Sequence, residues 1–332
     1  MAVERALALT KNNGKVIVIT GKSHVPHVIA NVAKLSAGKK KRLLVIGEPV
    51  AKNTAPAVAC AVSLSLLYGG GRNMLVLTSD HIIKSPEVFK VDAELAASSA
   101  ATGKLVVFGI PPSRPETGYG YIETCKAAAA ATAGVSGVAA FHEKPDPQTA
   151  KKYAASKRFF WNSGMFAFSV ESMAEHFRSL APDVFLPFEK LKAPKPDFYA
   201  VSSGVQILSA WPGLDNAYRK TKSISFDYAI TEKCPNTVMV RTNFEWIDIG
   251  NWEEYVKVCG NRKSQVFSVS GETCYVDSDI PVALAGVEDL IVVIRSGKDG
   301  GPATALVTRK GQTQKVREVV DQIKKAGMAE LL

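Results

Sequence analysis

The 332-residue sequence contains no long hydrophobic run, no paired-cysteine motif and no secretory leader. No apolar stretch approaches the roughly 20 residues that a membrane helix needs, and residues 1–7 carry an acid and lack the apolar segment of a signal peptide. The five cysteines are odd in number, scattered and without C-x-x-C spacing, which argues against a zinc site and for reduced thiols. These absences predict a cytoplasmic protein that does not contact a membrane.

The sequence also has little that suits nucleic acid. The densest basic run, residues 39–42, leads into an apolar strand-like segment, and no aromatic residues interleave with it to stack on bases. A solvated loop is the favoured interpretation of this run, so we expect no nucleic-acid partner. The formal net charge of +10 still suits an anionic ligand, although it does not identify one.

Glycine-rich phosphate loops are absent from the sequence. Gly21 follows a predicted strand and precedes a lysine, but Val16 occupies the position of the first glycine of a P-loop. Residues 69–71 follow a helical segment and precede a strand, which is the wrong order for holding phosphate at a helix N-terminus. Residues 297–301 join two strand-like runs as a hairpin turn. None of these segments predicts a nucleotide phosphate site.

Strand-like and helical segments alternate through the first half of the chain. This alternation predicts a mostly parallel sheet covered by helices on both faces. The expected strands are residues 15–20, 42–46, 73–78 and 104–110, and the expected helices are residues 27–36, 54–67 and 86–99. Two further strands, residues 137–144 and 159–168, flank a short helix at 147–156, as if an insertion extends the sheet.

The chain length and its 46% apolar content predict one large domain, residues 1–260, followed by a small domain, residues 261–332. A strand at 237–241 and a helix at 252–258 end the large domain. The expected elements of the small domain are strands at 266–269, 290–295 and 304–308, a turn at 296–301 and a helix at 314–325.

Two aspartates interrupt segments that otherwise have the composition of buried strands. Asp80 closes the apolar run 74–79, and Asp248 lies inside the run 246–250. A buried carboxylate is costly unless a cation or hydrogen-bond donors hold it, and ligands bind at the carboxyl ends of strands in α/β sheets. One hypothesis is that the two acids share a metal ion and a phosphate. The alternative, favoured for either residue taken alone, is that each caps the following helix.

Polar residues between these aspartates suit a sugar phosphate. Glu143 could accept hydrogen bonds from hydroxyl groups, and Lys144 could pair with a phosphate. Asn162 lies between aromatic and apolar residues, a setting in which amides hold sugars. Gly118 and Gly120 let a ligand approach the backbone. Taken singly, each of these motifs is more often a turn or a strand end.

The order of the motifs is more specific than any one of them. In chain order they are Glu48-Pro49-Val50-Ala51-Lys52-Asn53-Thr54-Ala55-Pro56-Ala57, Thr78-Ser79-Asp80-His81, Pro115-Glu116-Thr117-Gly118-Tyr119-Gly120-Tyr121, Glu143-Lys144-Pro145, Trp161-Asn162-Ser163-Gly164-Met165-Phe166, Ser225-Phe226-Asp227-Tyr228-Ala229 and Trp246-Ile247-Asp248-Ile249-Gly250-Asn251-Trp252. This series resembles the mannose-1-phosphate guanylyltransferases (GDP-mannose pyrophosphorylases) of the sugar-nucleotide pyrophosphorylase superfamily. The resemblance extends from about Glu4 to the C-terminus.

The resemblance implies a Rossmann-like nucleotide-diphospho-sugar transferase fold (GT-A-like) with a small C-terminal β/α domain, and it makes a homodimer an expectation. The implied reaction transfers GMP from GTP to α-D-mannose 1-phosphate and gives GDP-mannose and pyrophosphate. A sugar-phosphate oxygen attacks the α-phosphorus directly, without a covalent enzyme intermediate. Catalysis then consists of positioning and of neutralising charge around the phosphates.

The resemblance also implies roles for residues that match the family's motifs. Asp80 and Asp248 would hold the Mg²⁺ that bridges the nucleotide and sugar phosphates, since hard oxygen ligands suit that ion. Glu48 would accept hydrogen bonds from the adjacent N1–H and amine of guanine. Asn53 and Thr54 would lie along the base and ribose.

The remaining implied roles concern the sugar and its phosphate. Gly118, Glu143 and Asn162 would contact the mannose, and Asp227 matches a family acid near the sugar. Lys144 would act in catalysis with the two metal-holding aspartates by contacting the sugar's phosphate.

This sequence departs from the family pattern in three places. A Thr-Ser-Asp-His motif at residues 78–81 replaces Pro-Ala-Asp-His, and Phe226 replaces an isoleucine. The third departure is at the front, where the family's first strand, Gly-Gly-x-Gly-x-Arg loop and Pro-Lys pair have no counterpart. Residues 2–9 already have helical composition, so we expect about 40–50 residues, the length of a strand, a loop and most of a helix, to be missing.

Three interpretations of the function stay open at this point. The first is an authentic guanylyltransferase whose sequence starts at an internal methionine and is poorly stable and inactive as it stands. The second is a non-catalytic sugar-nucleotide-binding or regulatory relative that has lost its phosphate loop. The third is a pyrophosphorylase for another hexose 1-phosphate or another base.

Overall fold

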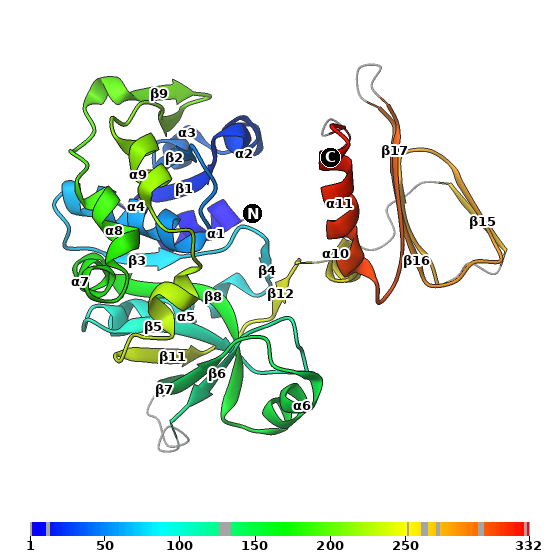
Figure 1. The fold of residues 1–332 in the computed structure, drawn as a ribbon, viewed down its shortest axis with the longest axis horizontal. Coiled ribbons are helices and arrows are strands. Elements are labelled where there is room, and N and C mark those ends of the chain that lie inside the picture. The colour runs from blue at the N-terminus through cyan, green and yellow to red at the C-terminus, as the bar shows by residue number, and fades with distance from the viewer. Residues whose placement is uncertain are drawn as a thin grey trace. The chain divides into compact units, whose positions relative to one another are not determined.

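The computed structural model describes residues 2–10, 14–125, 134–250, 252–259, 265–269, 273–297, 302–328 and 331 (Figure 1). The chain forms two compact units, which are described separately. Unit 1 consists of Met1–Ser79 and Ile83–Trp246, and unit 2 consists of Asp80–Ile82 and Ile247–Leu332. The domain boundary expected between residues 260 and 261 lies outside the described residues.

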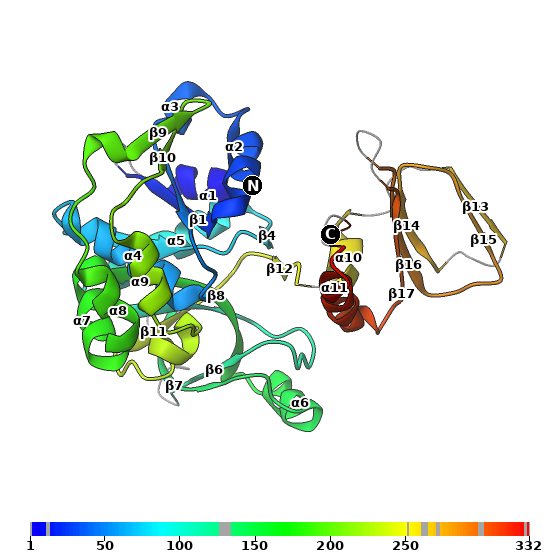
Figure 2. The ribbon, with the colours of Figure 1, turned by 45° about the horizontal axis from the view of Figure 1, so that its top comes forward.

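A four-stranded sheet in unit 1 has the order β1-β2-β10-β9. Its strands are β1 (Val16–Gly21), β2 (Leu43–Glu48), β9 (Tyr199–Ser202) and β10 (Val205–Leu208). β2 pairs in parallel with both β1 and β10, while β9 and β10 form an antiparallel hairpin that lies beside α3 (Ala37–Lys40) in Figure 2. Helix α2 (Val25–Val32) begins the crossover from β1 to β2.

A six-stranded sheet has the order β3-β8-β5-β11-β7-β6. Its strands are β3 (Asn73–Val76), β5 (Leu105–Ile110), β6 (Tyr121–Thr124), β7 (Val135–His142), β8 (Phe159–Ser169) and β11 (Thr237–Arg241). β3, β5 and β11 run in one direction, because β8 is antiparallel to both β3 and β5 and β11 is parallel to β5. Helix α6 (Pro147–Ala155) connects β7 to β8, so the inserted segment extends the sheet as the sequence predicts.

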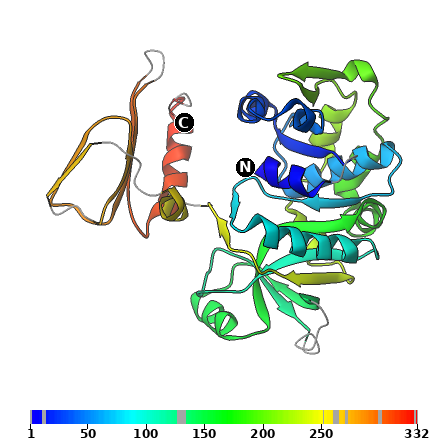
Figure 3. The same cartoon turned by 180° about the vertical axis from the view of Figure 1, so that it is seen from behind.

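Helices cover both faces of unit 1. One layer contains α4 (Thr54–Leu67), α7 (Val170–Leu180), α8 (Pro182–Glu189) and α9 (Leu214–Lys220), and its core includes Ile46, Val107 and Phe168. The opposite layer contains α1 (Ala2–Leu9) and α5 (Pro86–Ala100), the latter crossing the sheet in Figure 3. Successive residues of the buried strand β5 pack on opposite faces of the sheet: Val106 belongs to one hydrophobic core and Val107 to the other. The predicted α/β class with helices on both faces is confirmed, but the six-stranded sheet is mixed: β5 and β11 pair in parallel, whereas the pairings of β8, β7 and β6 are antiparallel.

The expected elements of the first half are present, with ends shifted by a few residues. The helix at 54–67 and the strands at 237–241, 266–269 and 290–295 have the predicted bounds. The sequence interpretation missed α7, α8, α9 and the hairpin of β9 and β10. Pro187 lies inside α8, and proline disfavours a helix because it lacks the backbone N–H donor. The local sequence therefore does not predict that helix.

The described part of unit 2 contains short sheets and helices, and strands β4 (His81–Ile83) and β12 (Trp246–Asp248) pair at its boundary with unit 1. Strands β13 (Val266–Val269) and β15 (Val282–Ala285) pair in parallel, and β14 (Tyr275–Ser278), β16 (Leu290–Arg295) and β17 (Thr304–Arg309) form a second sheet. Both parallel pairings join residues 16 apart, as in Val266 with Val282 and Tyr275 with Ile291. The chain therefore winds in coils of about 16 residues, a repeat that sequence inspection did not find.

The helices of unit 2 are α10 (Trp252–Cys259) and α11 (Val316–Lys325). Trp252 and Tyr255 of α10 pack on Tyr275 and Ile291. The turn expected at 296–301 lies partly outside the described residues. Among the helices that the structure describes, none is both long and apolar enough to cross a membrane.

Asp92 is a buried carboxylate that ties α5 to the end of β11. It is 2% exposed and accepts hydrogen bonds from the backbone N and the Nδ2 of Asn243, at 2.9 and 3.1 Å. Asp92→Ala would leave both donors unsatisfied, so we expect the free energy of unfolding to fall by about 2–3 kcal/mol. Glu94→Ala, on the exposed side of the same helix, is the control and should change it by less than about 0.5 kcal/mol. Urea unfolding followed by fluorescence measures both, and equal effects would contradict this role for Asp92.

Candidate active site

Two aspartates and a histidine of unit 2 form a cluster that could hold a metal ion. Each of Asp80, His81 and Asp248 offers one ligand atom, and these atoms lie within 4.8 Å of one another. Nε2 of His81 is 3.9 Å from a carboxylate oxygen of each aspartate. The backbone N of Ile249 donates to the carbonyl of Asp80 at 3.4 Å, which holds the two acidic segments side by side.

The structure brings Asp80 and Asp248 together although they are 168 positions apart in the sequence. Among the described residues, neither aspartate accepts a hydrogen bond from the first backbone N–H groups of a helix, and the N-cap of α5 is Ser85, so the capping interpretation has no support there. No role is predicted for His81 from the sequence, although it belongs to the motif at residues 78–81. Its position beside Asp80 was the available signal, but only the fold shows that its ring reaches both carboxylates.

Asp248 has an altered acidity that follows from its surroundings. Burial, and then the negative charges of Asp80 and Glu254, raise its pKa to about 6. A divalent cation would relieve both effects, because it replaces lost hydration and offsets the repulsion between carboxylates. Two carboxylate ligands fit Mg²⁺, whereas the imidazole of His81 would suit a transition metal better.

Glu48 lies at the carboxyl end of β2 in unit 1. Its Oε1 is buried and has no hydrogen-bond partner in the described part of the chain. Burial raises the pKa of Glu48, and the nearby Tyr218 hydroxyl opposes that shift. A buried acceptor without a donor favours a ligand that supplies N–H groups, as the edge of guanine does.

Asn53 and Thr54 form the start of α4. Asn53 has a left-handed backbone (φ 71°), and its side-chain oxygen accepts a hydrogen bond from the backbone N of Thr54 at 2.8 Å. The hydroxyl of Thr54 accepts from the backbone N of Phe226 at 2.8 Å. This second bond ties α4 to the segment that carries Asp227, so both residues shape the backbone around the candidate site.

The predicted sugar residues Asn162 and Asp227 contact each other directly. Nδ2 of Asn162, on β8, donates to Oδ1 of Asp227 at 2.8 Å. Asp227 begins a short π-helix, Asp227–Thr231. Burial is the main cause that raises the pKa of Asp227; the Asn162 hydrogen bond and Lys144 lower it, and the charge of Glu143 raises it. Residues from two segments distant in the sequence therefore influence one carboxylate.

Glu143 and Lys144 follow the end of β7 and complete this group. Nζ of Lys144 is 3.0 Å from Oε1 of Glu143. Glu143 also lies against Gly120, where an added Cβ would be only 2.7 Å from Oε2, so a larger residue there would displace the Glu143 carboxylate. The backbone N of Asn162 donates to the carbonyl of Gly120 at 2.8 Å.

Gly118, the other predicted sugar contact, has a different local role. Its backbone N donates to Oε1 of Glu116 at 2.9 Å, which closes a tight turn before β6. Gly120 is the glycine that lies against Glu143 and Asn162. The predicted role of Gly118 stays a prediction.

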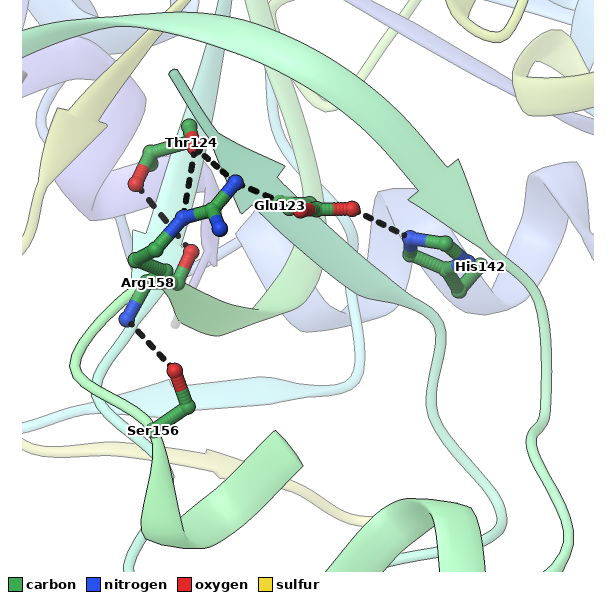
Figure 4. Close-up of polar contacts among 5 residues, drawn as sticks. All are labelled: Glu123, Thr124, His142, Ser156 and Arg158. Atoms are coloured by element: carbon green, nitrogen blue, oxygen red, sulfur yellow. Dashed lines mark hydrogen bonds and ion pairs between the residues drawn. The ribbon is translucent and has the colours of Figure 1, made fainter. Parts of the chain in front are cut away.

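An ion-pair cluster that sequence inspection did not find lies at the base of the Glu143 segment (Figure 4). Glu123 on β6 accepts a hydrogen bond from Arg158 at 2.6 Å, and its other oxygen is 3.0 Å from Nε2 of His142. Arg158 also bonds to the carbonyl of Thr124, and its own carbonyl accepts from the Thr124 hydroxyl. The cluster fixes the end of β7 one residue before Glu143.

The geometry defines the class of protein. Unit 1 is a doubly wound α/β unit with a buried carboxylate acceptor, the hydrogen-bonded pair of Asn162 and Asp227, and Lys144 near strand ends; unit 2, taken by itself, carries a cluster that could hold a metal ion. Such a combination is that of a nucleotide-binding α/β protein that handles phosphates.

Comparison with known proteins identifies the family. The nucleotidyl transferase family model matches residues 4–264, so this chain belongs to the nucleotidyl transferase family. The xanthan biosynthesis protein XanB of Xanthomonas campestris pv. campestris (strain B100) is 34% identical over 331 residues, with 93% of this chain and 64% of the relative covered. The mannose-1-phosphate guanylyltransferase of Escherichia coli is 35% identical over 315 residues, covering 91% and 64%. The chain thus spans less than two thirds of the length of these relatives.

Solved structures support the same fold. The mannose-1-phosphate geranyltransferase from Thermus thermophilus superposes with a TM-score of 0.72 and 25% sequence identity, covering 94% of this chain and 99% of that chain. The mannose-6-phosphate isomerase from Helicobacter pylori gives a TM-score of 0.62 at 24% identity, covering 74% and 88%, which shows similarity of fold alone. The Rossmann-like nucleotide-sugar transferase fold is confirmed.

Metal binding to the unit 2 cluster should depend on pH. Because the raised pKa of Asp248 is about 6, its carboxylate is ionised above pH 6 and becomes protonated below it. We expect the affinity for Mn²⁺, used as a paramagnetic probe for Mg²⁺, to be constant above pH 7 and to fall about tenfold per pH unit below 6. Water-proton relaxation titrations measure this affinity. Asp248→Asn should abolish the pH-dependent binding, whereas Asp321→Asn on exposed α11 should not; a pH-independent affinity from 5 to 7.5 would exclude Asp248 as a ligand.

Proposed function

We propose that this protein transfers GMP from GTP to α-D-mannose 1-phosphate, giving GDP-mannose and pyrophosphate. The observation that carries the proposal is the group formed by Asn162, Asp227, Glu143 and Lys144, which gathers two carboxylates, an amide and an ammonium from three segments of unit 1. The names of its relatives, which include mannose-1-phosphate guanylyltransferases, support the choice of sugar and base.

In this proposal the sugar group and the base residue have separate roles. Asp227 and Glu143 accept hydrogen bonds from sugar hydroxyls, and Asn162 orients Asp227. Lys144 offsets the charge of the sugar's phosphate. Glu48 accepts hydrogen bonds from N1–H and the exocyclic amine of guanine, with Asn53 and Thr54 shaping the adjacent backbone.

The reaction itself is a direct displacement. A phosphate oxygen of mannose 1-phosphate bonds to the α-phosphorus of GTP, and the bond from that phosphorus to the bridging oxygen of pyrophosphate breaks. Asp80 and Asp248 would hold a divalent cation, which we propose to be Mg²⁺; when bound, such a cation neutralises charge on phosphate oxygens. The protein's own contribution is to hold the two substrates so that attack is in line.

Three further parts of the proposal concern the setting of the reaction. We place it in the cytoplasm, where thiols such as the four described free cysteines stay reduced. Neither a membrane nor nucleic acid is part of the proposed activity. The homodimer stays a prediction, and sedimentation would test it.

Binding and turnover together test the function. We expect GDP-mannose to bind the 332-residue chain at least tenfold more tightly than UDP-glucose, and Asp227→Asn to weaken that binding about tenfold because a charged acceptor of hydroxyl hydrogen bonds is lost. Glu232→Gln, an exposed position directly after the same π-helix, is the control. Calorimetry measures binding, and a coupled pyrophosphate assay with GTP and mannose 1-phosphate measures turnover.

Turnover should be weak in this chain, because no segment of its sequence offers a glycine-rich loop of backbone N–H groups for the triphosphate. Tighter binding of another nucleotide sugar would overturn the choice of substrate. GDP-mannose binding without turnover, in a chain to which a phosphate loop has been restored, would favour the non-catalytic binding relative.

Glu48 should decide the choice of base. Glu48→Gln keeps the shape of the side chain but replaces one acceptor oxygen by a donor amide, so we expect GDP-mannose affinity to fall about 10- to 100-fold. The inosine analogue of GDP-mannose lacks the exocyclic amine. It should bind the wild type more weakly than GDP-mannose does, whereas the variant should bind the two ligands with almost equal affinity. The variant should stay folded, because burial raises the pKa of the Glu48 carboxyl and so disfavours the charge that the substitution removes. An unchanged preference for guanine over inosine would contradict this role.

A further inference from the structure

The segment between β5 and β6 has no regular secondary structure and is rich in proline and glycine. Residues 111–115 include three prolines, which lack a backbone N–H, and Gly118 and Gly120 follow. Glycine loses more conformational freedom on folding than any other residue, so such a segment needs contacts from side chains to hold one conformation. We call residues 114–120 the glycine loop.

The glycine loop borders the group that is proposed to hold the sugar. The backbone N of Asn162 donates to the carbonyl of Gly120 at 2.8 Å, and a Cβ added at Gly120 would be 2.7 Å from Oε2 of Glu143. Thr117 and Gly118 are exposed, so the backbone before Gly120 can meet a ligand that binds to this group. The conformation of the loop therefore decides where its backbone lies relative to Asn162 and Glu143.

Glu116 is the side chain that holds the middle of the glycine loop. Its Oε1 accepts a hydrogen bond from the backbone N of Gly118 at 2.9 Å. Its Oε2 accepts from Nε and Nη2 of Arg114, at 3.3 and 3.1 Å. Its own backbone N donates to the hydroxyl of Tyr121 at 3.0 Å. One residue thus connects both ends of the loop to its middle.

The partners of Glu116 are held by other parts of unit 1. Tyr121 is fully buried at the start of β6, and Cζ of Arg114 lies 5.4 Å from the centroid of the Trp161 ring. Trp161 is 4% exposed and directly precedes Asn162 on β8. Glu116 therefore connects the glycine loop to the same stretch of β8 that carries Asn162.

The carboxylate of Glu116 is largely occupied by these bonds. Its side chain is 26% exposed, and three N–H groups take three of the roughly four acceptor positions that a carboxylate offers. Hydrogen bonds to a charged acceptor are stronger than those between neutral groups. Because the protein itself uses these positions, Glu116 suits a role in holding the loop better than direct contact with a ligand.

We propose that Glu116 is a positioning residue for the sugar: its carboxylate holds residues 117–120 in the conformation that places their backbone beside Asn162 and Glu143. Gly118 belongs to the same arrangement, because a Cβ at that position would be 3.2 Å from Oε1 of Glu116 and would crowd the carboxylate. The inference rests on the proposed function for the identity of the ligand, but the conformation of the loop does not depend on that function.

Binding of ligands with and without the sugar tests this role. Glu116→Gln keeps the size of the side chain but replaces one oxygen by an amide, which cannot accept from either Gly118 or Arg114. We expect it to weaken GDP-mannose binding to the 332-residue chain about tenfold and GDP binding by less than about twofold, because GDP lacks the mannose. Calorimetry measures both affinities. Equal loss for both ligands, or no loss for either, would overturn the proposal.

Two further variants control this experiment. Glu116→Asp retains a carboxylate that can accept from the N–H two residues later, as aspartate does in an Asx turn, so GDP-mannose affinity should stay within about threefold of the wild type. Glu87→Gln, an exposed acid in the first turn of α5, should change neither affinity. An aspartate variant that binds as weakly as the glutamine variant would contradict a role for the carboxylate.

Hydrogen exchange followed by NMR tests the loop without any ligand. We expect the amide of Gly118 to exchange at least about tenfold faster in Glu116→Gln than in the wild type, whereas the amides of β5 stay protected in both and show that the variant is folded. Unchanged exchange at Gly118 would overturn the positioning role even if binding changed. If the chain does not bind GDP-mannose, that failure belongs to the proposed function, and exchange at Gly118 alone decides the role of Glu116.

Discussion

The cost of burying a carboxylate governs the candidate site. Glu48, Asp227 and Asp248 each have a pKa raised chiefly by burial, and each lies at or near the end of a strand or the start of a short helix. Each acid loses hydration without gaining a full set of partners from the protein. In unit 1, base N–H groups would suit Glu48 and sugar hydroxyls would suit Asp227; in unit 2, a divalent cation would suit Asp248. The proposed function thus rests on these carboxylates, for which the protein itself does not provide a full set of partners.

The inserted β7–α6–β8 segment makes the sugar group feasible. Because β8 runs antiparallel between β3 and β5, it carries Asn162 to the edge where the parallel strands end. The π-helix then places Asp227 within hydrogen-bonding distance of that amide. The cluster of Glu123, His142 and Arg158 fixes β7 just before Glu143. Packing and ion pairs away from the site therefore position the residues that would contact the sugar.

Much of this arrangement could be predicted from the sequence. Runs such as residues 43–46 have strong β propensity, and α4 has a proline in its first turn, so the local signals agreed with the fold. The places of Asp80 and Asp248 at strand ends made a shared metal ion one hypothesis, but no local pattern relates positions 80 and 248, so the resemblance was needed to favour it over capping. The roles of His81 and of the Glu123 cluster were missed because their significance lies in contacts between segments that are distant in the sequence.

The sequence by itself determined the α/β class and the motif series of a nucleotidyl transferase, because these depend on composition, periodicity and residue order. Only the tertiary structure decided which polar groups meet, which acids are left without partners and in which order the strands pair. Backbone pairing and burial are set by strands far apart in the chain. Strands β1 and β3 show this most clearly: each has ordinary β composition, and only the sheet order reveals that each is paired on one edge alone among the described strands.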